Sequence, residues 1–415
     1  MFENYIKFIS GLLFIFPATM LVLWGSYTII NYIFIVIGIW VLISKHSNLI
    51  SGTASTGGKS LATIFFLYAL IGVGLNLYHH ESIKLYGEYL PFLLMPAAYW
   101  AIVVSSANPW PLWLGSAVGG ILSFFFSLYQ VYFLRNARAF GHIDSIQYGN
   151  AGILLATASL VGLLHMKNYQ YQNKKELLII LFGILGGLGT SFLSGSKGGW
   201  LSILIVLIVM YRLLATEWQP IKRRAISMLV IIGLMFIFLI PGSLVNSRMH
   251  DAYVDFTLWR DTGSAKGGSV GPRLELWRFG LSVAGEKPLI GFGHNGFMER
   301  KDQAVKAGLF DPQIVGYAGL HNQFLHNYVV NGIVGLFNLC GLFIFIFILF
   351  SRYKNKNTPF VRELALMGML VVVLNIEFGM SNALFPLNAV RQIFLFWIVA
   401  LFALIQVQIR KSEIN

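Results

Sequence analysis

Long apolar runs recur along the chain, separated by mostly short polar connections. Each run is close to the roughly 20 residues that an α-helix needs to cross a bilayer. Backbone polar groups in lipid must be paired within their own segment, so each run is expected to be helical. The pattern predicts an all-α polytopic membrane protein with about 12 transmembrane helices, at residues 6–24, 27–43, 61–78, 90–106, 112–134, 149–166, 177–195, 200–215, 225–245, 324–350, 364–384 and 387–408.

One connection is far longer than the others. Residues 246–320 form a large loop of about 75 residues, and connections of that length inside a compact protein are usually functional. The loop separates predicted helices 1–9, in residues 1–245, from helices 10–12, in residues 321–415. We expect it to be a lid or a small domain on the outer face. Its segment RLELWRFGLSVAGEKPLIGFGHNGF predicts an amphipathic helix with one face formed by Leu274, Trp277, Gly280 and Leu281.

The distribution of charge predicts the orientation. The chain has a mean hydropathy of +0.69, and it is only 11% charged, with a net charge of +13. With the N-terminus inside, 16 of the 30 Lys and Arg residues but only five of the 17 acids fall on the inner side, which leaves about +11 inside and +2 outside. This bias is typical of membrane proteins with a positive inner side. We therefore expect both termini on the cytoplasmic side and no nucleic acid partner.

The first apolar run and the single cysteine also fit a membrane protein. The N-terminal run lacks an A-x-A-like cleavage site, so we interpret it as the first spanning helix and not as a removed signal peptide. The single cysteine, Cys340, excludes an internal disulfide and lies in an apolar run, where it is expected to be a packing residue.

Several basic residues lie beside the outer ends of the predicted helices. Arg135 and Arg138 follow the fifth helix in RNARAFGHIDSIQYGN, Lys197 lies between the seventh and eighth in SGSKGGW, and Arg391 lies early in the twelfth. Ionisable groups near membrane depth normally face the bundle interior or an aqueous cavity, although each could instead extend to lipid headgroups. Several such bases around one opening at the outer side of the bundle favour a binding site for a diphosphate or another polyanion.

The stretch HNQFLHNYVVNGIVG, residues 321–335, places polar side chains at the edge of an apolar run. His321 and His326 are five positions apart, about 140° around a helix, so they cannot share a face as metal-binding i,i+4 pairs do. No HExxH, D-x-D or G-x-S-x-G motif occurs, and His79-His80-Glu81 is interpreted as a solvated surface. No metal or other cofactor is therefore predicted.

The remaining candidate for acid–base chemistry is His321, which can act as a base near neutral pH. Glu275 is one possible partner for it, unless that carboxylate is simply solvated on the loop helix. His326 is expected to be a supporting or packing residue. Gly332 and Gly335 are expected to allow close helix contact.

The motifs and their order resemble the O-antigen ligase and O-antigen polymerase superfamily. His321-Asn322, followed after nine residues by Gly332-x-x-Gly335, resembles the family's histidine signature. GPRLELWRFGL followed by KPLIGFGHNGF resembles the segment that precedes it, and SGSKGGWL resembles the family's Ser-Arg-Gly turn, with Lys197 where arginine is usual. The plan of twelve helices with one large outer loop before the histidine extends the resemblance over nearly the whole chain.

The resemblance implies a metal-independent, inverting glycosyltransferase with a GT-C-type fold in the bacterial inner membrane. Such enzymes take a glycan from undecaprenyl diphosphate on the periplasmic side, and the ligases pass it to a sugar hydroxyl of lipid A-core. His321 would match the family's essential histidine, Arg273 its loop arginine and Lys197 the arginine of the turn. Lysine keeps the charge but loses bidentate geometry.

These residues suggest a mechanism that is open to test. A diphosphate leaving group needs cations more than a general acid, so basic side chains can replace a metal. We expect His321 to position or deprotonate the acceptor, and Asn322 to hydrogen-bond sugar or loop backbone. The diphosphate is expected to bind Arg273, Lys197, Arg138 and Arg391, with Arg135, Arg278 and Glu275 as further candidates for substrate binding.

Other reactions fit the same residues. Polymerisation of repeat units and transfer to a protein side chain use the same donor, and the ligase is favoured because one long loop carrying Arg273 directly precedes His321. A transporter of lipid-linked glycans is a second class. Inverted repeats with broken helices would favour it, and the sequence shows no such repeat.

Overall fold

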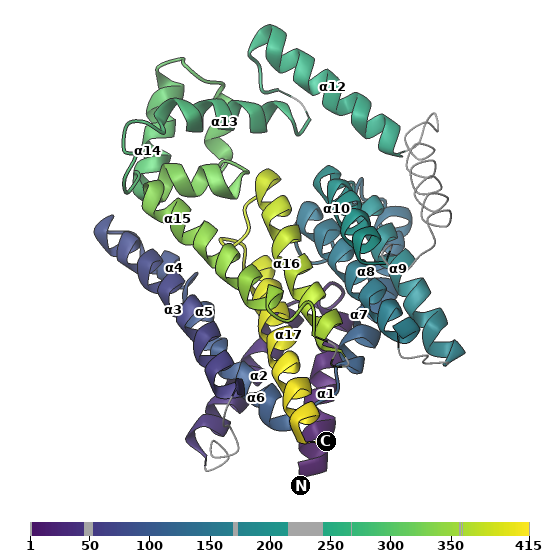
Figure 1. The fold of residues 1–415 in the computed structure, drawn as a ribbon. Coiled ribbons are helices and arrows are strands. Elements are labelled where there is room, and N and C mark those ends of the chain that lie inside the picture. Colours follow the sequence, from purple (N-terminus) through teal and green to yellow (C-terminus); the bar gives the residue numbers. More distant parts are fainter. Residues whose placement is uncertain are drawn as a thin grey trace.

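The computed structural model describes residues 2–44, 53–168, 173–214, 244–266, 268–356, 358 and 360–414. These residues form α-helices joined by turns and contain no β-strand (Figure 1). The first half of the chain contains α1 (Phe2–Thr19), α2 (Ser26–Ile43), α3 (Thr53–Tyr78), α4 (Ile83–Tyr86), α5 (Leu90–Leu94), α6 (Pro96–Ser105), α7 (Trp110–Leu128), α8 (Ser145–Asn168), α9 (Lys174–Ser194) and α10 (Lys197–Leu214).

The second half of the chain continues with the helices of the large loop and then the last three long helices. A π-helical turn at Tyr129–Phe133 extends α7, and a 3-10 helix at Pro312–Gly316 lies in the large loop. The helices are α12 (Leu244–Thr262), α13 (Gly271–Val283), α14 (Gly293–Lys306), α15 (Gln323–Ser351), α16 (Val361–Ser381) and α17 (Asn388–Ile414).

Nine segments of the described residues are long and apolar enough to span a membrane, which makes the chain a multi-pass membrane protein. They are Ser26–Ile43, Thr56–Tyr78, Ile83–Ser105, Trp110–Phe133, Ser145–Lys167, Lys174–Ser194, Gln323–Ser351, Val361–Ser381 and Asn388–Glu413. Each coincides with one of the twelve predicted runs. The run at 6–24 is helical in α1, which begins with an exposed Lys7–Glu3 ion pair, and the run at 200–215 gives only the shorter apolar segment Gly198–Val209. The predicted helix at 225–245 lies outside the described residues, so the count of twelve stays a prediction.

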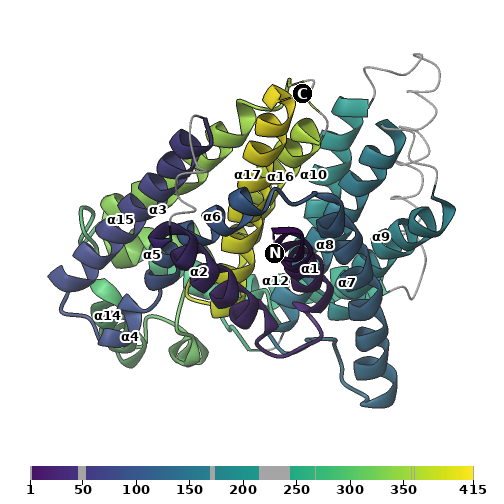
Figure 2. The ribbon, with the colours of Figure 1, turned by 90° about the horizontal axis from the view of Figure 1, so that it is seen from below.

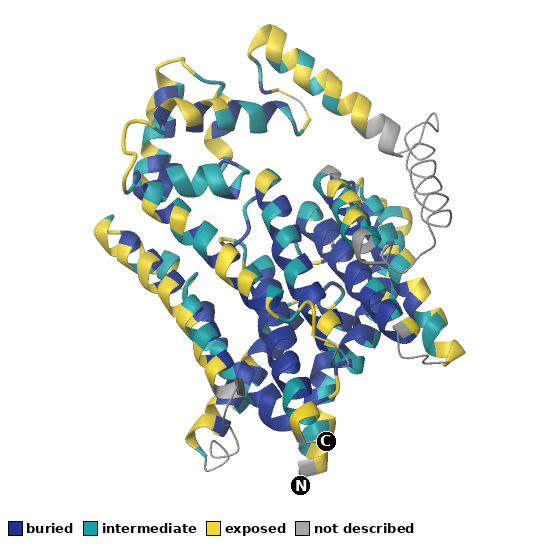
Figure 3. Ribbon diagram, in the orientation of Figure 1, coloured by how far each residue is buried: buried dark blue, intermediate teal, exposed yellow. Residues whose placement is uncertain are grey.

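Helix α17 forms the centre of the bundle. Its side chains are buried almost without interruption from Ile393 to Val407, and it packs against α2, α3, α6 and α16 (Figures 2 and 3). Beside it, α7, α8 and α9 approach one another at the level of the backbone. A Cβ on Gly120 would lie 2.4 Å from the Gly183 carbonyl oxygen, and one on Gly187 would lie 2.5 Å from the Gly152 carbonyl oxygen. Small residues at such crossings let helices pack closely in a membrane.

The helices of the large loop gather at one end of the bundle. In Figure 1, α12, α13 and α14 lie at the end opposite to both chain termini. Phe279 of α13 and Phe297 of α14 lie in one small apolar core together with Leu276, Ile314 and Leu320. In the described part of the predicted loop, the chain is therefore largely helical, and α15 leads from this region into the bundle.

Helix α15 is broken where the large loop crosses it. Gly332 has φ 64° and ψ −165°, and a Cβ there would lie 2.2 Å from the carbonyl group of Leu289. The N–H groups of Ile333 and Val334 donate to the carbonyls of Pro288 (2.8 Å) and Leu289 (3.2 Å). The backbone that Gly332 approaches closely thus belongs to the loop and not to another helix.

Two asparagines of the same stretch bridge this break. The Asn331 side chain donates to Asn327 (2.7 Å), and the Asn327 side chain donates to the carbonyl of Gly335 (2.9 Å). Their amide groups therefore satisfy backbone and side-chain polar atoms at the interruption, which a helix entering an apolar environment requires.

Candidate active site at the outer end of the bundle

His321 lies at the junction between the large loop and α15. Its φ of 48° is in the left-handed region, which costs a residue with a side chain about 1–2 kcal/mol. The next residue, Asn322, caps α15: its Oδ1 accepts hydrogen bonds from the N–H groups of Phe324 (3.1 Å) and Leu325 (3.0 Å). The backbone partners of Asn322 thus belong to α15 and not to the loop, and its capping bonds help to fix the strained residue before it.

The imidazole of His321 is held from two sides. Its Nδ1 lies 3.1 Å from Oδ1 of Asn382, at the end of α16, and the ring of Tyr317 meets it edge to face with 5.3 Å between the ring centroids. Burial and the nearby charge of Arg273 lower the pKa of His321 below its usual 6.5, while the Asn382 hydrogen bond and Asp144 act in the opposite direction. The ring is therefore neutral at neutral pH and can accept a proton.

Arg273, in the first turn of α13, is the charged group with the largest effect on the pKa of His321. Burial and the neighbouring charge of Arg138 lower the pKa of Arg273, and Asp144 and Tyr317 oppose that shift. Because arginine starts from a pKa above 12, the guanidinium remains charged. Two guanidinium groups close enough to repel each other form a favourable site for an anion with two phosphoryl groups.

Arg138 connects this cluster to the turn before α10. Its Nη2 donates to the carbonyl of Gly195 (3.0 Å), which has a left-handed φ of 63° at the end of α9. This turn carries Lys197, the first residue of α10, whose side chain lies outside what the structure describes. The structure thus places Arg273 close enough to both Arg138 and His321 to interact electrostatically with each.

Two other predicted residues lie apart from this cluster. Arg391, in the first turn of α17, donates to the Phe385 carbonyl and to Asn388 Oδ1 (3.3 Å), and its charged neighbour is Glu88. Arg135 is exposed, with a left-handed φ of 55°. Among the described residues, neither side chain contacts His321 or Arg273, so their expected role at the diphosphate is not supported by the geometry.

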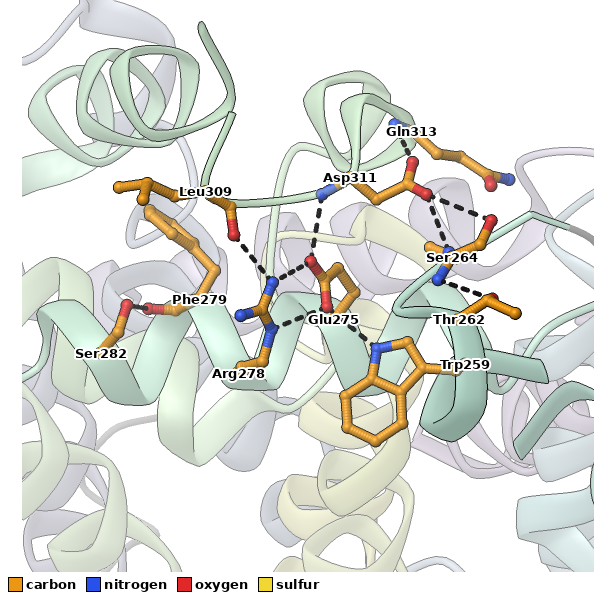
Figure 4. Close-up of polar contacts among 11 residues, drawn as sticks. Trp259, Thr262, Ser264, Glu275, Arg278, Phe279, Ser282, Leu309, Asp311 and Gln313 are labelled. Atoms are coloured by element: carbon orange, nitrogen blue, oxygen red, sulfur yellow. Dashed lines mark hydrogen bonds and ion pairs between the residues drawn. The ribbon is translucent and has the colours of Figure 1, made fainter. Parts of the chain in front are cut away.

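Glu275 and Arg278 belong to the framework of the large loop (Figure 4). The Glu275 carboxylate is buried and accepts hydrogen bonds from Trp259 Nε1 (2.9 Å), from Arg278 Nε (2.9 Å) and Nη2 (2.6 Å), and from the N–H of Asp311 (3.1 Å). Burial alone would raise its pKa, but these hydrogen bonds lower the pKa of Glu275 below its usual 4.5. The predictions of a solvated Glu275 or of a His321 partner are both wrong, because the carboxylate joins α12, α13 and residue 311.

This network also corrects the predicted face of α13. The buried side is formed by Glu275, Leu276, Phe279 and Val283, whereas Leu281 is 66% exposed. Arg278 donates to the Leu309 carbonyl (2.9 Å) and its guanidinium lies 4.2 Å from the centroid of the Phe310 ring. Arg278 and Glu275 also border an open cavity of about 760 Å³, together with Lys266, Asp311 and Gln313.

Further contacts hold the loop against the bundle. Lys301 is fully buried and donates to the carbonyls of Val315 (3.2 Å) and Tyr317, which fixes the segment that carries Tyr317. The interpretation of His79-His80-Glu81 as a solvated surface holds for the exposed His80. It is wrong for the other two residues, because His79 Nε2 bonds the Ile290 carbonyl (2.8 Å) and the buried Glu81 accepts from the N–H of Asn295 (3.2 Å). His326 packs edge to face against Phe297, as expected of a packing residue.

Three neighbours of His321 were not predicted from the sequence: Asp144, Tyr317 and Asn382. Asp144 lies only a few positions after Arg138 in the segment RNARAFGHIDSIQYGN, and this closeness in sequence could have marked it as a candidate. Nothing in the spacing of Tyr317 or Asn382 indicated a role. Within the described residues, no three His, Cys, Asp or Glu side chains gather as they would around a metal ion.

The segment that carries several of these residues is similar to a known protein family. The family model described as O-antigen ligase matches residues 182–340, a stretch that contains Lys197, Arg273 and His321. The match supports membership of the O-antigen ligase/polymerase superfamily for this part of the chain. An uncharacterized protein of Haemophilus influenzae is 29% identical over 271 residues, which cover 63% of this chain and 65% of that relative's length. The chain therefore spans less than two thirds of the length of that relative.

Proposed function

We propose that this chain is an O-antigen ligase, which transfers a glycan from undecaprenyl diphosphate to a sugar hydroxyl of lipid A-core. In this proposal the enzyme has a GT-C-type fold and lies in the bacterial inner membrane, with both termini cytoplasmic and the active site facing the periplasm. The observation that carries it is the convergence of Arg138, Arg273 and His321 from three separate segments at one end of the bundle.

The chemistry of the cluster fits a direct displacement. The acceptor hydroxyl attacks the anomeric carbon, the bond from that carbon to the diphosphate oxygen breaks, and the configuration inverts. Arg273 and Arg138 stabilise the negative charge that develops on the leaving diphosphate. His321, neutral at neutral pH, takes the proton of the attacking hydroxyl. Lys197 is a further cation for the diphosphate, on the turn that Arg138 contacts, and no metal enters the proposal.

The large loop supports this assignment. The open cavity of about 760 Å³ offers charged and amide groups, including Lys266, Arg278 and Gln313, on the same loop that carries Arg273. Polar groups of this kind suit the hydroxyls of a saccharide that extends away from the membrane.

The test is transfer by the purified protein in lipid nanodiscs, with an undecaprenyl-diphosphate glycan and lipid A-core. We expect the product to form without added metal and in the presence of EDTA, to be lost in His321→Ala, and to be retained in the exposed control Arg135→Ala. Full activity of His321→Ala would contradict the role of the histidine, and a strict need for Mg²⁺ would contradict the use of arginines in place of a metal.

The same experiment separates the alternatives. Elongation of the lipid-linked glycan without lipid A-core would indicate an O-antigen polymerase. Transfer to an added protein acceptor would indicate a protein O-oligosaccharyltransferase. Movement of the donor across a liposome membrane without transfer would indicate a transporter of lipid-linked glycans.

A further inference from the structure

We infer that Asn382 is a positioning residue that holds His321 in the Nδ1-protonated tautomer, so that Nε2 is the atom that receives the acceptor's proton. The inference rests on the proposed function for its catalytic part. Its structural part, the tautomer itself, stands on the geometry around Asn382.

The orientation of the Asn382 amide is fixed by a backbone donor. Oδ1 of Asn382 accepts a hydrogen bond from the N–H of Ala383 at 2.9 Å. A backbone N–H can only donate, so the atom that faces it must be the amide oxygen and not the amide nitrogen. The same oxygen lies 3.1 Å from Nδ1 of His321.

This arrangement dictates where the imidazole proton lies. The amide oxygen carries no proton, so Nδ1 of His321 must be the donor in their hydrogen bond. A neutral imidazole has one N–H, and Nε2 is then unprotonated. Among the described residues none donates a hydrogen bond to Nε2 of His321, so its lone pair is available to an incoming hydroxyl.

Asn382 itself is firmly placed. It is only 5% exposed, it ends α16, and its N–H donates to the Phe378 carbonyl (3.1 Å). Two residues on, the N–H of Leu384 donates to the side chain of Gln323 (2.7 Å), in the first turn of α15. The segment after α16 is therefore tied to the helix that begins directly after His321.

The choice of an amide over a carboxylate has a chemical consequence. The charged and titratable groups around His321 are Arg273 on α13, Asp144 before α8, Tyr317 in the large loop and His326 on α15, with Arg138 acting on Arg273. Asn382 orients the ring without adding charge. A carboxylate in its place would stabilise the imidazolium and raise the pKa of His321.

The experiment is NMR of [15N]histidine-labelled protein in nanodiscs, with the His321 signal identified by its loss in His321→Gln. We expect the wild-type ring to be protonated at Nδ1. Asn382→Ala should mix the two tautomers, and Asn382→Asp should keep Nδ1 protonated but raise the pKa of His321 by about one unit or more. The matched control is Asn338→Ala, a bilayer asparagine whose side chain donates to the Tyr68 carbonyl, and it should leave the signal unchanged.

Kinetics supply the second readout. We expect Asn382→Ala to lower kcat about 10- to 100-fold with little change in KM, because the base is misaligned while substrate contacts remain. In Asn382→Asp the acidic limb of the kcat profile should move to higher pH. A purely structural Asn382 would reduce yield or activity without moving either the tautomer or that limb.

The outcomes are distinguishable. A wild-type ring protonated at Nε2, or an Asn382→Asp variant with unchanged tautomer and unchanged pKa, would overturn the inference while leaving the proposed function intact. Full activity of His321→Ala would overturn both the proposed function and the catalytic part of the inference. In that case the resonance of His321 would still decide the tautomer.

Discussion

The break in α15 at Gly332 should be intolerant of the smallest side chain. With φ 64° and ψ −165°, Gly332 adopts a conformation that is essentially restricted to glycine. A methyl group there would meet the Leu289 carbonyl at 2.2 Å and the Ile290 nitrogen at 2.4 Å. Both neighbours are backbone, so Gly332→Ala must push the loop segment 288–292 away from the helix.

The expected cost follows from what this separation breaks. Three hydrogen bonds join the two segments: Ile333 N–H to Pro288 O, Val334 N–H to Leu289 O, and Phe292 N–H to Val329 O. Each contributes about 1 kcal/mol net, and forcing alanine into this backbone region costs a further 1–3 kcal/mol or so. The local opening free energy should therefore fall by about 4–6 kcal/mol, which corresponds to roughly 10³- to 10⁴-fold faster amide exchange at about 1.4 kcal/mol per factor of ten.

Hydrogen–deuterium exchange in nanodiscs measures this directly, on peptides that cover residues 286–294 and 327–336. The control is Gly341→Ala in the same helix, where the added methyl would meet its nearest neighbour, the Phe345 ring, at an ordinary 3.7 Å. Glycan transfer should fall in Gly332→Ala as well, because the displaced segment anchors the loop that carries Arg273. Wild-type protection of both peptides in Gly332→Ala would refute the reasoning.

Three further outcomes follow from the site. Arg273→Lys keeps the charge but loses the planar fork, so kcat/KM for glycan transfer should fall about 100-fold, against less than about twofold for the exposed Arg135→Lys; equal effects would contradict the role of Arg273. Glu275→Gln removes a buried charge that accepts hydrogen bonds from three groups, so the free energy of local unfolding around residues 309–313 should fall by about 1.5–3 kcal/mol. Limited proteolysis at residues 309–313 should measure this loss, which should be absent in the exposed control Glu299→Gln. The stabilisation by Glu275 should be complete above pH 4.5 and disappear as the pH falls through its lower folded-state pKa, so proteolysis at residues 309–313 should increase only in strongly acidic buffer. Transfer should require neutral His321, with an acidic limb of kcat below pH 6.5 because burial and Arg273 lower that pKa; a limb above 6.5 would contradict the assigned environment.

Much of the bundle was predictable from the sequence because the bilayer imposes a simple rule. A run of about 20 apolar residues must be a helix in lipid, and nine of the predicted runs have spanning segments among the described residues. The rule fails for α13, where the buried face includes Glu275. A face chosen by apolar residues cannot anticipate a carboxylate that is buried because donors from Trp259 and Asp311 reach it from other segments.

The candidate site likewise contains residues that the sequence could predict and residues that it could not. His321, Arg273 and Arg138 could be proposed from the sequence because their residue types are unusual beside membrane helices and their order resembles a known family. Asn382 could not, because its role depends on the end of α16 meeting the start of α15, 61 positions away in sequence. The predicted close contact of Gly332 with another helix is wrong, because the backbone next to it belongs to the large loop. A glycine in the sequence does not distinguish contact with a helix from contact with a loop.

The division of the site among distant segments has a consequence for how the protein is made. Arg138, the turn at Gly195, Arg273 and His321 are all synthesised before Asn382, which follows the second-to-last helix. A nascent chain that has inserted everything up to α15 already holds the cations and the imidazole, but the ring has no acceptor to orient it. Full reactivity toward a lipid-linked sugar is therefore expected only after α16 has entered the bilayer, so a late step of membrane insertion would also raise the activity of the enzyme.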